Sequence, residues 1–254
     1  MIKQFLQSLA RKAGYEIVNL RNPVATGLFP QDFDQDTIQT VLKVRAFTVT
    51  SPARIYCLVK AVEYVLRAGV PGSIVECGVW KGGSMMAVAE TLRRAGRTDL
   101  DLFLFDTFEN WHGMPPPTDK DGPSVRHSWE GNRSTPVQAE TSLNQVRRNL
   151  SSTGYPDDRV HLVEGTVEDT LPARAPSQIS ILRLDTDLYE STRHELVHLY
   201  PRLSDGGVLI IDDYGSPEYV GAKKAVDEYI EENRLRLLLN RIDADGRIAV
   251  KPGS

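Results

Sequence analysis

Two short apolar runs that end in aspartates constrain this chain more than any other feature. The first is ISILRLDTDLY, residues 179–189, and it ends with Asp185 and Asp187. The second is GGVLIIDDY, residues 206–214, and it ends with Asp212 and Asp213. Continuous runs of Ile, Leu and Val are typical of parallel strands buried on both faces. Since ligands of an open α/β sheet bind beyond the carboxyl ends of the strands, we expect these acids at the functional site.

Four carboxylates on two neighbouring strand ends would repel one another unless a positive charge lay between them. A divalent cation is the obvious candidate, and Mg²⁺ prefers hard oxygen ligands of this kind. The alternative is that the aspartates only cap helices and form turns, which requires no metal.

Strand patterns and helix patterns alternate from residue 73 onward. We expect strands at 73–77, 101–105, 160–164, 179–184 and 208–211, with helices between them. Asp245-Gly246 is a hairpin signal between two shorter strand-like pieces, 235–242 and 247–251. The pattern predicts an α/β, doubly wound sheet, mostly parallel with a C-terminal antiparallel hairpin.

Helix signals precede this core. Ser51-Pro52 is a strong helix start, and Gly69 ends that helix. A second helix is expected over 36–47. The Pro- and Gly-rich stretch 115–136 predicts a long loop or lid.

Composition excludes several classes of protein. The 254 residues are 41% hydrophobic and 25% charged, which argues against disorder. A net charge of -4 leaves no basic footprint for nucleic acid, and no run of about 18 apolar residues predicts a membrane span. Cys57 and Cys77 lie in no metal-ligand pattern, as expected for reduced thiols in a cytoplasmic protein.

The N-terminus has the apolar spacing of a short amphipathic helix rather than that of a signal peptide. We expect residues 1–50 to form an N-terminal helical extension with an arm or lid, and residues 51–254 to form the main domain. A helix and arm outside the core indicate self-association, so a homo-oligomer, dimer or higher, is expected.

The turn VECGVWKGGS, residues 75–84, follows a strand and begins a helix. Its glycines allow close approach of a ligand, and the helix N-terminus offers free N–H groups. However, the spacing is not GxGxxG, and Glu76 is a poor neighbour for a pyrophosphate. A carboxylate suits an ammonium group, which favours S-adenosylmethionine over NAD. A purely structural turn remains an alternative.

Further acids follow the next two strands. Asp106 stands where doubly wound folds place an acid for ribose hydroxyls. Thr166, Val167 and Glu168 follow the third strand, where Glu168 is either a contact of the adenine or a plain helix-start acid. His127, in the predicted lid, is a candidate general base.

Seven motifs in the same order resemble the macrocin O-methyltransferase family. They are VECGVWKGGS, LFLFDTF, SLNQVRRNL, VEGTVEDTLP, LRLDTDLYEST, PRLSDGGVLIIDDY and AVDEY. The resemblance covers about residues 51–251. It implies a class I, Rossmann-like methyltransferase domain that uses S-adenosylmethionine and Mg²⁺ to methylate a sugar hydroxyl of a glycosylated natural product or related glycoside, as in antibiotic biosynthesis.

The resemblance also assigns roles to residues. It places the metal on Asp185, Asp212 and Asp213, and a general base on Asp187. His127, a candidate base from its place in the predicted lid, remains the alternative. The implied cofactor contacts are Thr50, Ser51, Glu76, Gly78, Val79, Trp80, Asp106, Thr107, Phe108, Ser142, Thr166, Val167, Glu168 and Asp185.

Residues 1–36 and 111–136, which would contact the acceptor, carry no match to the family motifs. The sequence therefore predicts a sugar-containing small-molecule acceptor but not its identity. A nucleotide- or NAD-binding enzyme acting on a sugar, a methyltransferase for a phenol or catechol, and a non-catalytic homologue are the alternatives.

Overall fold

The computed structural model describes residues 29–109, 112–133 and 141–253. Within these ranges, seven strands form one sheet in the order β3-β2-β1-β4-β5-β7-β6. The strands are β1 (Ser73–Cys77), β2 (Leu102–Asp106), β3 (Val160–Glu164), β4 (Ile179–Leu184), β5 (Leu203–Ile211), β6 (Asn240–Arg241) and β7 (Arg247–Val250). Strands β1 to β5 are parallel, and β7 runs antiparallel to β5 and β6. The predicted α/β sheet with a C-terminal antiparallel hairpin is confirmed.

The register of the central strands brings their carboxyl ends to one level. Cys77 on β1 pairs with Phe105 on β2 and with Leu184 on β4, and Leu184 pairs with Ile211 on β5. The residues that follow these positions are Gly78, Asp106, Asp185 and Asp212. A glycine turn and three acids therefore meet at the same edge of the sheet.

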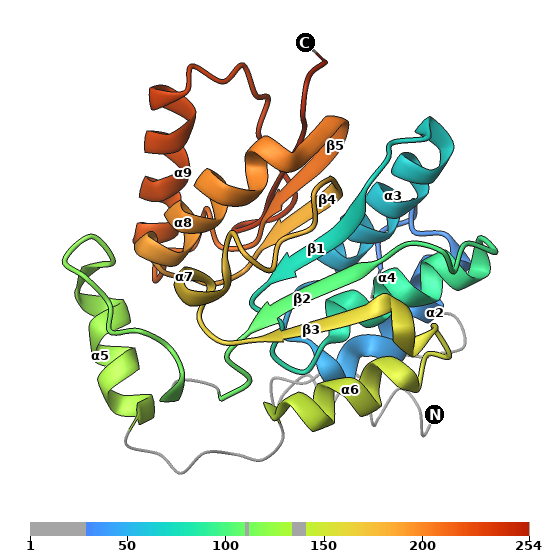
Figure 1. Ribbon diagram of the computed structural model, residues 1–254, viewed down its shortest axis with the longest axis horizontal. Helices are drawn as coiled ribbons and strands as arrows, with labels where there is room; N and C mark the ends of the chain where they lie inside the picture. The colour runs from blue at the N-terminus through green and yellow to red at the C-terminus, as the bar shows by residue number, and fades with distance from the viewer. Residues whose placement is uncertain (1–28, 110–111, 134–140, 254) are drawn as a thin grey trace, which may run out of the picture. The chain divides into compact units, whose positions relative to one another are not determined.

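Helices pack on both faces of this sheet, whereas helix α5 stands away from it (Figure 1). Their bounds are α2 (Gln35–Val44), α3 (Pro52–Ala68), α4 (Gly83–Arg94), α5 (Gly122–Arg133), α6 (Leu143–Ser151), α7 (Val167–Thr170), α8 (Tyr189–Leu199) and α9 (Val220–Glu232), with short 3-10 helices η1 (Arg45–Phe47), η4 (Asp157–Arg159) and η5 (Tyr200–Arg202). Helix α3 packs beside α4 on one side, and α8 packs beside α9 on the other. Ser51 caps α3 and left-handed Gly69 ends it, as the sequence predicts.

The core lies on both faces of the central strands, which explains their continuous apolar sequences. All six residues of β4 are buried, including the charged Arg183. Strand β1 buries four of its five residues. An arginine in such a strand requires partners nearby, because an unpaired buried charge is costly.

Three segments differ from the sequence-based predictions. Helix α5 forms within the stretch predicted as a loop, and it begins at Gly122-Pro123, where a proline is compatible with the first turn. Only Val125 is buried on it among the side chains described, so no hydrophobic stripe signals the helix. Strand β5 begins earlier than predicted, at Leu203, and only Asn240–Arg241 pairs within 235–242.

The chain divides into two compact units, Met1–Gln39 and Thr40–Ser254. Every residue that forms the site below belongs to the second unit. The expected helix at the N-terminus lies outside the described residues, and the domain boundary between residues 50 and 51 stays a prediction. Among the described residues, no helix is both long and apolar enough to cross a membrane.

Candidate active site

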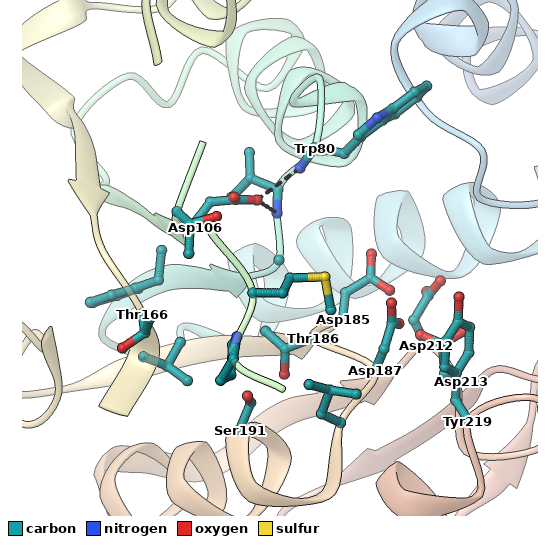
Figure 2. A pocket seen from close by; sticks show the side chains of 18 of the residues that line it. Trp80, Asp106, Thr166, Asp185, Thr186, Asp187, Ser191, Asp212, Asp213 and Tyr219 are labelled. Carbon is teal, nitrogen blue, oxygen red and sulfur yellow. Dashed lines mark hydrogen bonds between the residues drawn. The ribbon is translucent and has the colours of Figure 1, made fainter. Parts of the chain in front are cut away.

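A cavity of about 460 Å³ lies beyond the carboxyl ends of β1, β2, β4 and β5 (Figure 2). Its volume is in the range of small-molecule binding pockets. Thirteen of the predicted site residues line it: Thr50, Gly78, Val79, Trp80, Asp106, Thr107, Thr166, Val167, Glu168, Asp185, Asp187, Asp212 and Asp213. Most of the residues predicted from the sequence thus lie around one cavity in the structure.

Asp106 ties the turn after β1 to the turn after β2. Its Oδ2 accepts hydrogen bonds from the backbone N–H groups of Val79 at 2.6 Å and Trp80 at 3.0 Å (Figure 2). Its Oδ1 accepts one from Phe108 at 2.8 Å. Burial raises the pKa of this carboxyl, and the backbone donors oppose that rise. The acid thus fixes the shape of the cavity wall.

Gly78 allows β1 and β4 to approach closely at the cavity floor. Its φ is 80°, in the left-handed region that favours glycine. A Cβ at this position would lie 1.9 Å from the carbonyl oxygen of Asp185. The backbone N–H of Asp185 in turn donates to the carbonyl of Cys77 at 2.9 Å. The glycine is therefore required by tertiary contact as well as by the turn.

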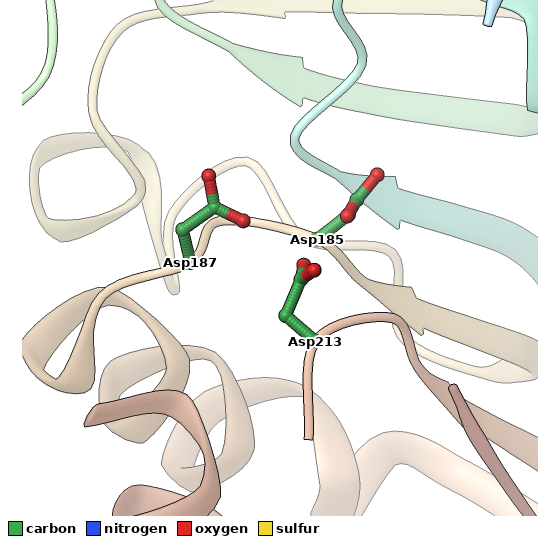
Figure 3. A group of neighbouring side chains, drawn as sticks. All are labelled: Asp185, Asp187 and Asp213. Atoms are coloured by element: carbon green, nitrogen blue, oxygen red, sulfur yellow. The ribbon is translucent and has the colours of Figure 1, made fainter. Parts of the chain in front are cut away.

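Asp185, Asp187 and Asp213 form an acidic cluster in which the carboxylates point toward one another (Figure 3). One oxygen from each lies within 4.8 Å of the others. Burial above all, and then the neighbouring carboxylates, raise the pKa of Asp187 to about 7 and that of Asp213 to about 9. Burial also raises the pKa of Asp185, and this effect outweighs the opposing charge of Arg183. Such a group could hold a cation that relieves the repulsion.

Asp212 lies outside this cluster, although it lines the same cavity. It is buried between two guanidinium groups, with Oδ2 bonded to Arg54 and Oδ1 2.6 Å from Nη2 of Arg183. The second contact is an ion pair without hydrogen-bond geometry. Arg54 also binds Asp243, with 3.0 Å between Nε and Oδ2. The structure thus groups Asp187, rather than Asp212, with Asp185 and Asp213.

Glu76 is 1% exposed and does not line the cavity. Its Oε1 accepts from Nη1 of Arg183 at 2.7 Å. Its Oε2 is buried and has no hydrogen-bond partner among the residues that the structure describes. Burial raises its pKa to about 7 and outweighs the opposing effect of Arg183.

The remaining predicted residues lie away from the cavity lining. His127 is exposed on α5, beside a separate hollow that it shares with Arg126 and Glu130. Ser51 caps α3 and donates to Asp243, Ser142 precedes α6 without capping it, and Phe108 is buried. The structure therefore does not bring His127 to the aspartates.

Sequence reasoning did not single out several residues of the site. Thr186, Ser191 and Tyr219 line the cavity, and Arg54 and Arg183 bind its aspartates. The sequence did contain a signal for Arg183, because a lone arginine inside an apolar strand must find a charged or polar partner once it is buried. Ser191 donates to Glu168 at 2.9 Å, a contact between α8 and α7 that no local pattern reveals.

Comparison with known proteins decides the family. The family model for Macrocin-O-methyltransferase (TylF) matches residues 18–250. The chain belongs to the macrocin O-methyltransferase family. The resemblance found in the sequence motifs is thereby confirmed, and with it the expectation that the protein is an O-methyltransferase.

Individual members of the macrocin O-methyltransferase family are similar over most of the chain. The Mycinamicin III 3''-O-methyltransferase of Micromonospora griseorubida is 36% identical over 79% of this chain and 77% of its own. The 8-demethyl-8-(2,3-dimethoxy-alpha-L-rhamnosyl)-tetracenomycin-C 4'-O-methyltransferase of Streptomyces olivaceus is 38% identical over 79% of this chain and 74% of its own. The Demethyldecarbamoylnovobiocin O-methyltransferase of Streptomyces niveus is 35% identical over the same shares.

Solved structures confirm the fold of the family. The O-methyltransferase NovP superposes with a TM-score of 0.73 at 29% identity, covering 92% of this chain and 97% of its own. The calicheamicin methyltransferase CalS11 gives a TM-score of 0.63 at 22% identity, covering 92% of this chain and 97% of its own, and supports the fold alone. The predicted class I methyltransferase architecture is confirmed.

Proposed function

We propose that this protein is an S-adenosylmethionine- and Mg²⁺-dependent O-methyltransferase that methylates a sugar hydroxyl of a glycosylated natural product. The observation that carries the proposal is the similarity at 35–38% identity to three O-methyltransferases named for such products. The name of the tetracenomycin enzyme specifies a rhamnosyl group on its substrate. A sugar-bearing small molecule is therefore the acceptor that we propose.

The cavity has the groups that S-adenosylmethionine requires. Asp106 lies at the end of β2, where acids bind ribose hydroxyls in doubly wound folds. Glu76 lies behind the cavity lining, and its Oε2 is a buried acceptor without a donor among the described residues, so an ammonium group would satisfy it only by reaching behind that lining. Thr166, Val167 and Glu168 line the part of the cavity that follows β3 and would contact the base. When bound, the cofactor supplies an electrophilic methyl group.

The acidic cluster fits Mg²⁺. Hard carboxylate oxygens of Asp185 and Asp213 lie close together with that of Asp187 beside them, and a cation would relieve the repulsion among the three. Asp212, the third metal residue implied by the family resemblance, lies beside them and is held by Arg54 and Arg183. When bound, the cation supplies positive charge that favours loss of the proton from an acceptor hydroxyl.

We assign the residues of this chain three tasks in methyl transfer. The walls of the cavity orient the acceptor hydroxyl toward the methyl group and exclude water. Asp187 would accept the proton that the hydroxyl loses as its oxygen bonds to the methyl carbon, while the carbon–sulfur bond of the cofactor breaks and its sulfur leaves as a neutral thioether. His127 lines a separate hollow and not this cavity, so Asp187 is our first choice of base.

Ligand binding tests the cofactor. S-adenosylhomocysteine at 100 times its dissociation constant should stabilise the protein by about 2.7 kcal/mol, whereas NAD⁺ should not shift the thermal midpoint. Differential scanning fluorimetry of the full chain measures both. Stabilisation by NAD⁺ alone would overturn the proposed cofactor and favour a nucleotide-using enzyme.

Substitution of one aspartate tests the metal. We expect Asp213→Ala to abolish methyl transfer to a deoxysugar glycoside, and to leave binding of S-adenosylhomocysteine intact, because Asp213 belongs to the acidic cluster. Asp205→Ala, an exposed aspartate on β5, is the matched control and should keep full activity. Full activity of Asp213→Ala in the presence of EDTA would contradict the metal assignment.

Two further predictions accompany this function. A cytoplasmic location is expected from the two free cysteines. A homo-oligomer is expected from the N-terminal extension, and light scattering of the purified chain measures it.

A further inference from the structure

Arg183 binds four groups at the cavity floor, although it stands inside an apolar strand. The residue is 3% exposed. Its Nη1 donates to Oε1 of Glu76 at 2.7 Å and to Oδ2 of Asp185 at 2.7 Å. Its Nη2 donates to Oγ1 of Thr50 at 3.0 Å and lies 2.6 Å from Oδ1 of Asp212.

These four partners come from four separate segments of the chain. Glu76 belongs to β1, Asp185 follows β4, Asp212 follows β5, and Thr50 precedes α3. A guanidinium has five N–H donors in a planar fork, so it can hold several oxygens in one fixed arrangement. An ammonium group is a point charge on a flexible stem and cannot span the same set.

The hold on Asp185 determines how that side chain meets the acidic cluster. One of its carboxylate oxygens, Oδ2, is bonded to Arg183. The carboxylate cannot turn freely, because the guanidinium is itself fixed by Glu76 and Thr50. Asp212 is held on the opposite nitrogen and is kept beside the cluster of Asp185, Asp187 and Asp213.

We propose that Arg183 is a positioning residue for methyl transfer, which sets the direction of the Asp185 and Asp212 carboxylates and thereby the affinity of the acidic cluster for a divalent cation. The inference rests on the proposed function. Substitution of a residue that hydrogen-bonds to a metal ligand typically lowers metal affinity or activity by about 10- to 100-fold. Arg183 acts through the aspartates and not by contact with a substrate.

Cation binding by the full-length protein tests the proposal. The variant is Arg183→Lys, and the probe is Mn²⁺, titrated without cofactor or acceptor and followed by electron paramagnetic resonance. We expect Mn²⁺ affinity to fall by at least about tenfold, and kcat for methyl transfer to fall with it. Unchanged Mn²⁺ affinity in a folded Arg183→Lys protein would overturn the proposal.

Arg202→Lys is the matched control. Arg202 also binds several acceptors through one guanidinium, the carbonyl groups of Ala175 and Pro176 at 3.1 and 2.9 Å. It lies just before β5, at the end of the strand remote from the aspartates. Its substitution should leave Mn²⁺ affinity unchanged. A fall in affinity equal to that of Arg183→Lys would show a general loss of structure and contradict a positioning role.

Thr50→Val is a second test if Arg183→Lys does not fold. It removes an acceptor of Arg183 and the long hydrogen bond of 3.4 Å that the same hydroxyl donates to Asp212, with little change in volume, and we expect a smaller but measurable loss of Mn²⁺ affinity. Wild-type affinity in this variant would count against the proposal. If the wild-type protein bound neither S-adenosylhomocysteine nor Mn²⁺, the proposed function itself would fail. If the wild-type protein bound both, and the variants bound Mn²⁺ as tightly as the wild type, only the proposed role of Arg183 would fail.

Discussion

Gly78 shows how one residue can combine a local and a tertiary requirement. Its positive φ suits the turn that leaves β1. The space for a side chain is filled by the carbonyl group of Asp185, a residue more than one hundred positions away in the chain. Gly96 has a similar φ of 68°, but a Cβ there would meet nothing within 4 Å. Comparing the two glycines therefore separates the free-energy cost of a left-handed backbone from the cost of close contact with Asp185.

We expect Gly78→Ala to destabilise the protein more than Gly96→Ala does. The left-handed backbone costs about 1–2 kcal/mol at either position. At Gly78 the overlap with Asp185 adds about 1–3 kcal/mol. Urea unfolding of both variants measures the difference in free energy. Equal losses would show that the ends of β1 and β4 separate easily.

At the scale of elements, Asp121 joins the start of helix α5 to the start of helix α8. This side chain is 1% exposed and precedes the first residue of the helix. Its Oδ1 accepts from the backbone N–H of Tyr189, in the first turn of α8, at 2.6 Å. Its Oδ2 accepts from the backbone N–H and the hydroxyl of Thr118, at 2.7 and 2.9 Å. One carboxylate thus links the start of α5 to the start of α8.

We expect Asp121→Ala to cost about 1–3 kcal/mol, because the buried N–H of Tyr189 loses its acceptor. The loss should also expose α5 to proteolysis before the rest of the domain unfolds. Chemical unfolding and limited trypsin digestion measure the two effects. Asp119→Ala is the control, since Asp119 is exposed and pairs only weakly with Arg126. Cleavage of α5 at the wild-type rate in Asp121→Ala would contradict this fastening role.

At the scale of the whole molecule, buried carboxyl groups make folding stability depend on pH. Glu195 on α8 is fully buried, and its Oε1 accepts from the hydroxyl of Thr186 at 2.9 Å. Burial raises its pKa well above the ordinary value. An acid with a raised pKa in the folded state binds more protons there than in the unfolded chain. Its stabilising contribution is therefore complete below the ordinary pKa and is lost as pH rises through the folded value.

We expect Glu195→Gln to reduce this dependence. Across the pH window above the ordinary value, the wild-type protein should lose up to about 1.4 kcal/mol per pH unit relative to the variant. The amide keeps an acceptor for Thr186 and carries no charge. Chemical unfolding at a series of pH values between 5 and 9 measures the difference. Parallel stability curves for the two proteins would contradict a raised pKa for Glu195.

The sequence by itself determined the order of the elements and the family. Alternating strands and helices, the Ser51-Pro52 helix start and the acids after the strands are local signals, and they predicted the sheet and most of the cavity lining. Seven motifs were enough for the family, because each includes a strand end or part of a helix of the core fold.

Only the tertiary structure decided which acids face one another. Four aspartates looked equivalent on two strand ends, yet Asp212 is bound by Arg54 and Arg183, whereas Asp185, Asp187 and Asp213 form the acidic cluster. Three of the four partners of Arg183, namely Glu76, Thr50 and Asp212, come from distant segments, so no local pattern could assign them. Helix α5 is likewise hidden from the sequence, because an exposed helix needs no apolar stripe, and its buried anchor at Asp121 acts across the fold.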